Sequence, residues 1–303
     1  MCLKVTDVTD REIVLADGSR AGFAIYGDPG GRPVLALHGA PACRLMFAMC
    51  DATARRLGLK IIAPDRPGYG LSPSDARLPA TLEHRAAWLA DFATAVRLDR
   101  FVILAISGGG PYAMAVAARL GARVQGVALV SPMGPAADYD ASPEAVQAPI
   151  SRTHRMFFLR ISQMPAVVRP AAWLFSVAVR VVPSVLFGAG SFLAGDADAG
   201  ILRRPAVRNV LLGMTREAFR QGGHGAADDL AIYGRPWPFQ VEDVTAPVVL
   251  WQGTADRIVP VAANLHLASR LPNCRLIRLD GAGHFWVLGA VDSVLAEAAA
   301  MFV

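Results

Sequence analysis

Residues 101–120 place the strongest constraint on the fold. An apolar, strand-forming run over residues 101–106 ends at Ser107, three glycines follow at residues 108–110, and residues 112–120 have the Ala-, Val- and Met-rich pattern of a helix. A serine at the apex of a strand-to-helix turn has a strained backbone and a hydroxyl exposed above the sheet, and only small residues fit beside it. The segment predicts such a turn.

The glycine run alone leaves three interpretations open. Gly108, Gly110 and Ala113 also fit the fingerprint of a dinucleotide-binding turn. That fingerprint normally begins a βαβ unit near the start of its domain and has an acid about 20 residues further on. Here residues 127–131 carry no acid, and several strands come before the turn. A nucleophile, a cofactor loop and a turn without chemistry must be distinguished by the rest of the chain.

Strand and helix patterns alternate along both ends of the chain. Continuous apolar strands separated by amphipathic segments are typical of a parallel sheet with helices on both faces. Asp17-Gly18 predicts a hairpin between the first two strands. We expect eight strands, at residues 12–15, 22–26, 34–38, 60–64, 101–106, 124–130, 248–251 and 275–279. We expect five helices between or after them, at residues 43–57, 82–98, 111–120, 262–271 and 285–302.

The alternation stops between residues 131 and 246, where the sequence is helix-like and interrupted by prolines. The predicted fold is therefore α/β, a doubly wound, mostly parallel eight-stranded sheet with a helical cap inserted after the sixth strand. A cap at this point would lie above the carboxyl ends of the strands, where open α/β sheets bind ligands. We predict a core over residues 1–133, the cap over 134–243 and the rest of the core over 244–303.

Composition excludes several classes of protein. The chain has 303 residues, 53% of them hydrophobic and 18% charged, which indicates a globular protein with a large core. Its net charge of +5 comes from scattered residues, so we expect no nucleic-acid partner. The four cysteines show no metal-type spacing, and residues 1–7 lack a signal-peptide pattern. These features predict a cytoplasmic protein with reduced thiols.

Residues 170–195 are long and apolar enough to suggest a membrane span. Arg180 lies in the middle of this stretch, Pro183 interrupts it and several glycines weaken it, and a central charge is rare in a span. We expect two short apolar helices that cover a pocket, and no membrane partner.

Two polar residues follow predicted strands in the last third of the chain. Asp256 comes after the strand at residues 248–251, and His284 comes after the strand at residues 275–279. A serine hydroxyl becomes a good nucleophile only when a base removes its proton and a third group orients that base. Each residue taken alone could be a turn or capping residue. Together with Ser107 they supply the three groups that nucleophilic catalysis needs.

The order of these three residues and two further motifs make the chain resemble a known protein family. Ser107, Asp256 and His284 follow one another in the order of the α/β-hydrolases. Residues 38–41, His-Gly-Ala-Pro, resemble the HG-x-P loop of that family, and residues 65–72, Asp-Arg-Pro-Gly-Tyr-Gly-Leu-Ser, resemble its D-x-x-G-x-G-x-S loop. Ala105 stands where the serine turn of the family usually has glycine. The chain is thus similar to cap-bearing serine hydrolases of the α/β-hydrolase family.

The resemblance implies roles for the motif residues. Ser107 would be the nucleophile, His284 the base and Asp256 its orienting acid, with the backbone N–H groups of Ala40 and Gly108 as the oxyanion hole. The 65–72 loop and His38 would be structural. No cofactor and no metal are implied, and the remaining histidines lack acids at metal-ligand spacing. Asp228 and Asp229 are predicted to be a solvated pair.

These roles favour hydrolysis of a carboxylic ester of a small, largely apolar molecule. Related epoxide hydrolases and haloalkane dehalogenases have aspartate at the position of Ser107, the apex of the strand-to-helix turn (the nucleophile elbow). Ser107 therefore argues against both activities. Perhydrolase, lyase and carbon–carbon bond hydrolase activities stay open, as does a non-catalytic ligand-binding role, because fold does not fix function. Apolar residues in the predicted cap indicate an apolar acyl or alcohol group, namely Phe157, Phe158, Trp173, Leu174, Phe175, Phe187 and Phe192.

Overall fold

A computed structural model describes residues 10–75 and 79–302, apart from the side chains of residues 191 and 192. One eight-stranded sheet runs through the molecule in the order β1-β2-β4-β3-β5-β6-β7-β8. The first two pairings, β1 with β2 and β2 with β4, are antiparallel and the others are parallel. The strands are β1 (Asp10–Val14), β2 (Arg20–Gly27), β3 (Arg32–Leu37), β4 (Leu59–Pro64), β5 (Phe101–Ile106), β6 (Val124–Val130), β7 (Val248–Gly253) and β8 (Cys274–Leu279).

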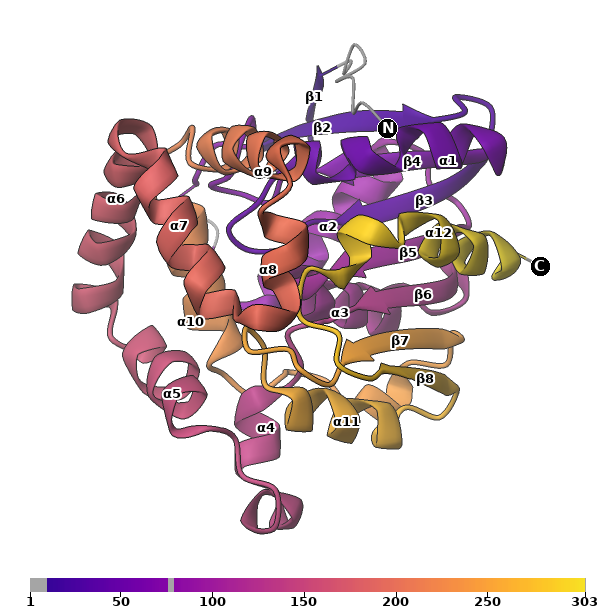
Figure 1. Ribbon diagram of the computed structural model, residues 1–303. Helices are drawn as coiled ribbons and strands as arrows, with labels where there is room; N and C mark the ends of the chain where they lie inside the picture. Colours follow the sequence, from indigo (N-terminus) through magenta and orange to yellow (C-terminus); the bar gives the residue numbers. More distant parts are fainter. Residues whose placement is uncertain (1–9, 76–78, 303) are drawn as a thin grey trace.

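Helices cover both faces of the sheet (Figure 1). Every residue of β5 is buried, because two apolar clusters lie against its opposite faces. One cluster packs the sheet against α2, α3 and α11, and the other packs it against α1 and α12. The doubly wound, mostly parallel fold predicted from the sequence is confirmed. The helices of this part are α1 (Asp51–Arg56), α2 (Leu82–Ala95), α3 (Gly110–Leu120), α11 (Val261–Arg270) and α12 (Val291–Ala300).

Two predicted helices are shorter than expected. The segment at residues 43–57 divides into the 3₁₀ turn η1 (Arg44–Cys50) and α1, and the segment at residues 285–302 divides into η8 (Trp286–Gly289) and α12. Both 3₁₀ turns come soon after a loop that lies close to Ser107, η1 after Gly39 and η8 after His284. The Asp17-Gly18 turn has the predicted place, with Gly18 at φ 80°.

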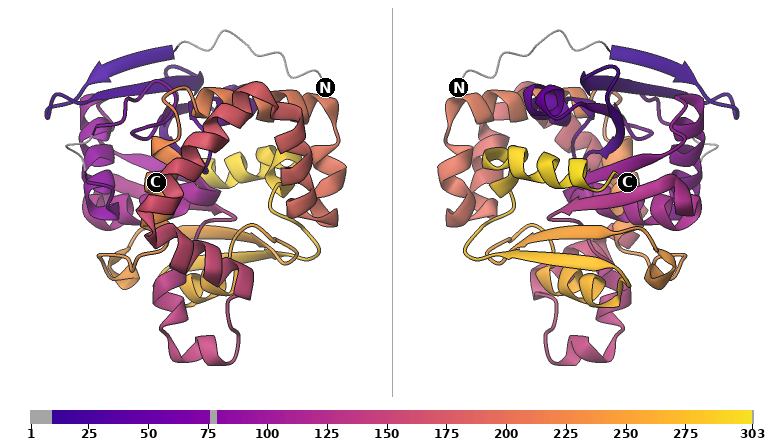
Figure 2. Two further views of the ribbon diagram at one scale, coloured as in Figure 1. Left: turned by 90° about the vertical axis from the view of Figure 1, so that its left-hand side faces the viewer. Right: turned by 90° about the vertical axis from the view of Figure 1, so that its right-hand side faces the viewer.

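The segment between β6 and β7 is helical and is called here the insertion. Its helices lie beyond one end of the sheet (Figures 1 and 2). They are α4 (Ala136–Asp140), α5 (Arg152–His154), α6 (Pro165–Val181), α7 (Pro183–Ala194), α8 (Asp196–Leu202), α9 (Pro205–Ala218) and α10 (His224–Tyr233). Three 3₁₀ turns, η4 (Pro143–Val146), η6 (Ile161–Gln163) and η7 (Val241–Asp243), and the π-helical turn η5 (Arg155–Arg160) complete the segment. The domain limits at residues 133 and 243 stay a prediction.

The 65–72 loop after β4 braces its neighbours, as the sequence predicts. The Asp65 carboxylate accepts hydrogen bonds from the backbone N–H groups of Arg44 and Leu71, at 2.6 and 2.8 Å. A side chain at Gly70 would place its Cβ 2.1 Å from the same carboxylate. The Ser72 hydroxyl accepts from Gly22 N–H at 2.9 Å, which attaches the loop to β2.

No single helix among the described residues is long and apolar enough to cross a membrane. Residues 152–163 and 165–181 together have the length and composition of a span, but the two parts meet at 104°. The predicted break at Pro183 is present, since α6 ends at Val181 and α7 begins at Pro183.

Candidate active site

Ser107 lies directly after β5 and has a left-handed backbone, with φ at 53°. Non-glycine residues rarely adopt this conformation, and its cost must be met by surrounding contacts. The carbonyl of Ser107 accepts a hydrogen bond from Met133 N–H at 2.8 Å, and its peptide leads into the short turn η2 (Ser107–Gly109). The sharp serine turn predicted from the sequence is therefore present.

Neighbouring segments explain why the residues around Ser107 are small. A Cβ on Gly109 would lie 2.3 Å from the Leu37 carbonyl oxygen, and one on Gly110 would lie 2.5 Å from Pro132. Both contacts are far shorter than any tolerated carbon contact, so larger residues would push β3 or the chain after β6 away. Ala105 is completely buried in β5, where its single methyl is accommodated.

Ser107, His284 and Asp256 form one chain of hydrogen bonds. His284 Nε2 is 2.9 Å from Ser107 Oγ, and His284 Nδ1 is 2.7 Å from Asp256 Oδ2. Asp256 lies in the loop after β7 and His284 in the loop after β8, so both come from the carboxyl ends of parallel strands. The structure thus brings together the three residues that the sequence singled out.

The charge of Asp256 decides which nitrogen of His284 carries the proton. Burial favours the neutral acid, but His284 and the N–H groups of Ile258 and Val259 outweigh it and lower the pKa of Asp256 below its ordinary value. An ionised carboxylate can only accept hydrogen bonds. His284 Nδ1 must therefore be the donor to Asp256, which leaves Nε2 free to accept from the Ser107 hydroxyl.

Sequence analysis missed Asp198 of α8, which holds the histidine loop. Its carboxylate is completely buried and accepts hydrogen bonds from the backbone N–H groups of His284 and Phe285, both at 2.8 Å. A Cβ on Gly283 would lie 2.3 Å from this carboxylate. No local sequence signal links Asp198 to His284, because the two residues belong to different parts of the chain.

Hydrogen bonds to the Gly39 carbonyl fix the orientation of the peptide group between Gly39 and Ala40. Gly39 O accepts hydrogen bonds from Arg66 Nη2 at 3.1 Å and from His38 Nδ1 at 2.7 Å. In a trans peptide the N–H points opposite to the C=O, so these bonds also orient the N–H of Ala40. Burial, together with the charge of Arg66, lowers the pKa of His38 well below its ordinary value. His38 is thus a neutral structural residue, as the sequence predicts.

The prediction that Asp228 and Asp229 are solvated is wrong. Both are buried in α10: Asp229 lies 2.5 Å from Arg66 Nη2, and Asp228 lies 2.9 Å from Arg85 Nη2. Their partners come from the 65–72 loop and from α2, which the sequence does not place beside α10. The hydroxyls of Tyr69, Tyr112 and Tyr233 also contact the Asp229 carboxylate.

Tyr233 connects this buried cluster to the serine turn. Its hydroxyl lies 2.9 Å from the carbonyl oxygen of Gly108 and 3.1 Å from Asp229 Oδ2. Burial, reinforced by the charge of Asp229, raises the pKa of Tyr233 well above its ordinary value, so the hydroxyl keeps its proton. A Cβ on Gly108 would lie 2.2 Å from the Tyr233 hydroxyl oxygen, which explains why residue 108 has no side chain.

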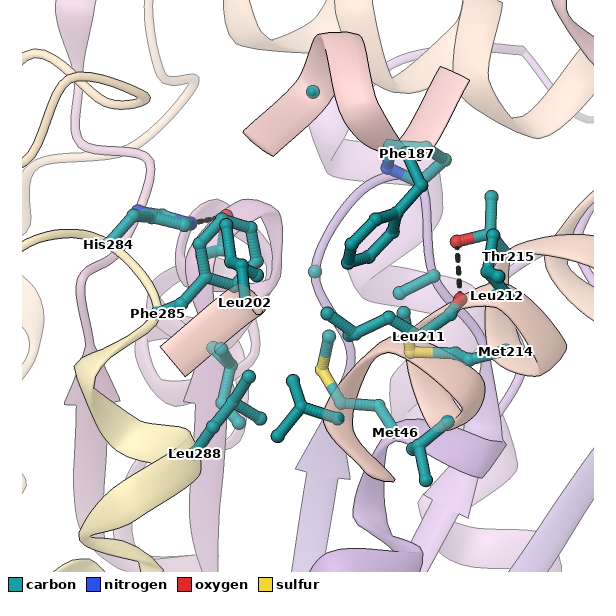
Figure 3. A pocket seen from close by; sticks show the side chains of 18 of the residues that line it. Met46, Phe187, Leu202, Leu211, Leu212, Met214, Thr215, His284, Phe285 and Leu288 are labelled. Carbon is teal, nitrogen blue, oxygen red and sulfur yellow. Dashed lines mark hydrogen bonds between the residues drawn. The ribbon is translucent and has the colours of Figure 1, made fainter. Parts of the chain in front are cut away.

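Ser107 and His284 line an apolar cavity of about 730 Å³. Figure 3 shows this cavity with His284 at its edge. Its walls come from the core and the insertion, and Phe187 of α7 faces Met46 and Leu288 across it. Arg204 is the one permanently charged side chain among the described residues that line it. The cavity is thus suited to an apolar molecule that reaches the serine.

The apolar insertion residues named from the sequence have different surroundings. Phe175 and Phe187 line the cavity. Phe157, Trp173 and Leu174 are exposed instead, and Phe158 packs against the main core cluster. The side chain of Phe192 lies outside the described residues. α6 and α7 therefore cover a pocket, as predicted, but much of their apolar surface faces outward.

Comparisons with known proteins identify the family of the chain. Residues 34–298 match the model described as alpha/beta hydrolase family. The pimeloyl-[acyl-carrier protein] methyl ester esterase of Aromatoleum aromaticum is 31% identical over 229 residues, which cover 75% of this chain and 81% of that protein. The chain therefore belongs to the alpha/beta hydrolase family. Family and relative support hydrolysis of an ester as the general activity.

Solved structures share the fold. Epoxide hydrolase A from Mycobacterium thermoresistibile has a TM-score of 0.73 at 19% identity, with 97% of this chain and 98% of that chain covered. The esterase EaEST from Exiguobacterium antarcticum has a TM-score of 0.69 at 15% identity, with 95% and 98% covered. At such identities the similarity shows the fold alone.

Replacing Asp198 should impair catalysis without unfolding the protein. In Asp198→Asn one oxygen can still accept a hydrogen bond, but the amide cannot accept the second, so the His284 loop loses an anchor. We expect kcat for a soluble ester to fall about ten- to a hundredfold, the range for a small misplacement of a catalytic group. Asp196→Asn, on the exposed side of the same helix, is the matched control. Equal kcat values for the two variants would contradict a positioning role.

Proposed function

We propose that this chain is a serine esterase that hydrolyses carboxylic esters of small, largely apolar molecules. Ser107 is the nucleophile, His284 the general base and acid, and Asp256 the residue that orients the imidazole. The backbone N–H groups of Ala40 and Gly108 form the oxyanion hole. No cofactor takes part in the proposed reaction. The insertion, over residues 134–243, acts as a cap above the substrate.

The observation that carries this proposal is the continuous hydrogen-bond chain at the floor of the apolar cavity. Ser107 Oγ, His284 Nε2, His284 Nδ1 and Asp256 Oδ2 are joined by distances of 2.9 and 2.7 Å. A general base within about 3.2 Å of the hydroxyl can take its proton as the oxygen attacks. Both Ser107 and His284 line the cavity, so a bound ester meets them directly.

Catalysis then proceeds in two halves. Ser107 Oγ attacks the ester carbonyl while its proton moves to His284 Nε2, and the resulting imidazolium is stabilised by the Asp256 carboxylate. His284 gives the proton to the leaving alkoxide, which departs as the alcohol and leaves an acyl group on Ser107. Water, deprotonated by His284, attacks this acyl group, and His284 returns the proton to Ser107 Oγ as the bond to the acyl group breaks and the acid leaves.

Two peptide planes support the proposed oxyanion hole. The carbonyl of Gly39 is held by Arg66 and His38, and the carbonyl of Ser107 is held by Met133 N–H. Each held carbonyl orients the N–H at the other end of its peptide, namely that of Ala40 or Gly108. Donors fixed before the reaction stabilise a developing oxyanion by several kcal/mol, because they need not reorient during it.

Other activities of the fold fit less well. A serine at the elbow argues against epoxide hydrolysis, although an epoxide hydrolase is among the similar structures. A non-catalytic binding role would not need a histidine hydrogen-bonded to both a buried carboxylate and the serine. Perhydrolase, lyase and carbon–carbon bond hydrolase activities share these three residues, so the preferred substrate must be measured.

Labelling should establish an activated serine. A fluorophosphonate probe is expected to add once to the wild-type protein and not at all to Ser107→Ala, as read from intact mass. Ester hydrolysis should fall at least about a thousandfold in the same variant, because no other group replaces the nucleophile. Ser269→Ala, at an exposed serine of α11, should label normally. An adduct retained in Ser107→Ala would contradict the proposed nucleophile.

Because the cavity is large and apolar, we expect the protein to prefer esters with longer acyl chains. Each buried methylene contributes up to about 0.8 kcal/mol, or roughly fourfold in binding. We expect kcat/KM to be at least about tenfold higher for p-nitrophenyl octanoate than for the acetate. Val207→Trp, which narrows the cavity, should reduce octanoate turnover more than acetate turnover. Equal kcat/KM for both chain lengths would argue against an apolar acyl site.

On the acid side of the pH profile, kcat/KM should depend on the loss of a single proton. Because the pKa of Asp256 is below its ordinary value, this residue stays ionised throughout the acid side of the profile, so the one proton that matters there is the proton of the base. Only neutral histidine can accept the serine proton, so log kcat/KM should rise with pH at a slope of one. A flat profile between pH 5 and 8 would exclude His284 as the base.

A further inference from the structure

The outward face of α6 is apolar, which is unusual for a helix at a protein surface. Its buried stripe consists of Val168, Ala172, Ser176 and Val179. On the opposite side, exposed apolar side chains follow one another at helical spacing. They are Val167, Trp173, Leu174, Val177 and Val181, with exposed fractions from 38% to 72%. A surface helix normally turns charged and polar residues outward, so this face is built for a contact.

Neighbouring segments extend the same surface. Met156 and Phe157 of η5 and Met164 precede α6, while Val182, Val185 and Leu193 follow it, and all six are exposed. With the five α6 residues they make up what we call the outer apolar face. These helices form the side of the molecule that lies away from the sheet (Figures 1 and 2). Large exposed apolar surfaces mark sites of interaction with proteins or membranes.

The charge around this face is positive. Residues 145–195 contain no aspartate or glutamate but five arginines, of which Arg155 pairs with Asp140 and Arg169 with Asp228. Arg203, Arg204 and Arg208 continue the series at α8 and α9, and all three are exposed. Within the described part of the chain, none of these three forms an ion pair, and Arg208 lies over the ring of Phe187. A partner with negative charge is therefore favoured, whereas a second copy of this face would be repelled.

The outer apolar face is also the outside of the cavity wall. Val179, Leu186 and Phe187 of α6 and α7 line the cavity from within. Phe175 and Leu193 both line it and are partly exposed, at 40% and 68%. Apolar surface therefore continues from the exterior of α6 and α7 to the space above Ser107.

We propose that the outer apolar face docks onto an anionic lipid surface. The valine, leucine and tryptophan side chains enter the interfacial layer, and the surrounding arginines bind lipid phosphates. Such interfacial binding combines buried apolar area with attraction to anionic lipids and needs no membrane span. This inference rests on the proposed esterase function. In the docked orientation, α6 and α7 contact the lipid, and esters dissolved in the lipid pass between them and the core into the cavity.

Trp173 provides a direct probe of docking. It is 60% exposed, whereas Trp88, Trp237 and Trp251 are at most 8% exposed. On addition of phosphatidylglycerol–phosphatidylcholine vesicles, we expect a blue shift of the tryptophan emission that is lost in Trp173→Phe. Sedimentation with the vesicles should show binding at least tenfold tighter than to pure phosphatidylcholine, and 0.5 M salt should weaken it, because salt screens the arginines.

Paired variants separate docking from chemistry. Val181→Asp/Val185→Asp places two charges in the face, outside the residues that line the cavity. Val14→Asp/Val146→Asp makes the same change at equally exposed valines elsewhere. The first variant should bind anionic vesicles at least tenfold more weakly than the second, and both should hydrolyse a water-soluble short-chain ester at the wild-type rate. Ser107→Ala should bind vesicles normally while losing hydrolysis.

Several results would overturn the proposal. Equal vesicle binding by the two valine variants, equal binding to neutral vesicles, or no binding at all would each do so. Concentration-dependent dimerisation that the Val181→Asp/Val185→Asp change abolishes would assign the face to a second copy of the chain. If the wild-type protein binds vesicles but does not hydrolyse the water-soluble ester, the proposed function is contradicted and the proposed docking surface is not.

Discussion

The arrangement around Ser107 depends on carboxylates of the insertion that pair with buried arginines of the core. Arg66 binds Asp229, Arg85 binds Asp228, and Arg44 binds Glu217 at 2.8 Å as well as Asp65. All three guanidinium groups are at least nine-tenths buried. For Arg66 and Arg85, removing the carboxylate leaves an unpaired buried charge and typically costs about 3–5 kcal/mol. Arg44 would keep Asp10 and Asp65 as partners. The pairs thus define where the insertion sits, whatever their net contribution to stability.

The same contacts reach the groups proposed to act in catalysis. Arg66 holds the Gly39 carbonyl, and Tyr233 joins Asp229 to the Gly108 carbonyl, so one buried cluster touches both sides of the proposed oxyanion hole. Asp198 holds the histidine loop from a different helix of the same insertion. Catalytic geometry must be held to a fraction of an ångström, and here the insertion supplies part of that precision in addition to a cavity wall.

Local sequence patterns were sufficient for the sheet and for the serine turn. The central strands are largely apolar, as in β5, where all six residues are apolar and buried. The turn at Ser107 needs glycines that only a close approach explains, so both features can be predicted without knowing the fold. Asp256 and His284 could be placed because the ends of parallel strands meet at one edge. The catalytic roles of these residues and the limits of the cap stay predictions.

Other features depend on contacts between distant segments, and no local pattern encodes them. Asp228 and Asp229 look like a solvated pair in the sequence, because their arginine partners lie about 140 to 160 residues away. Asp198 lacks any motif for the same reason. Helical periodicity indicates that α6 has a buried stripe, but its outward apolar face becomes evident only when the packing of the whole insertion is known.

The distribution of these ion pairs has a consequence for protein engineering. An insertion between two strands invites exchange between related enzymes as a means of changing substrate range. In this chain, a transplanted insertion that lacks acids at the positions of Asp228 and Asp229 would leave Arg85 and Arg66 without their carboxylate partners. One that lacks an acid at the position of Glu217 would remove one of the three carboxylates that surround Arg44. One that lacks Asp198 would also release the histidine loop. The exchangeable unit is therefore the insertion together with its arginine partners, which are spread over the first third of the chain.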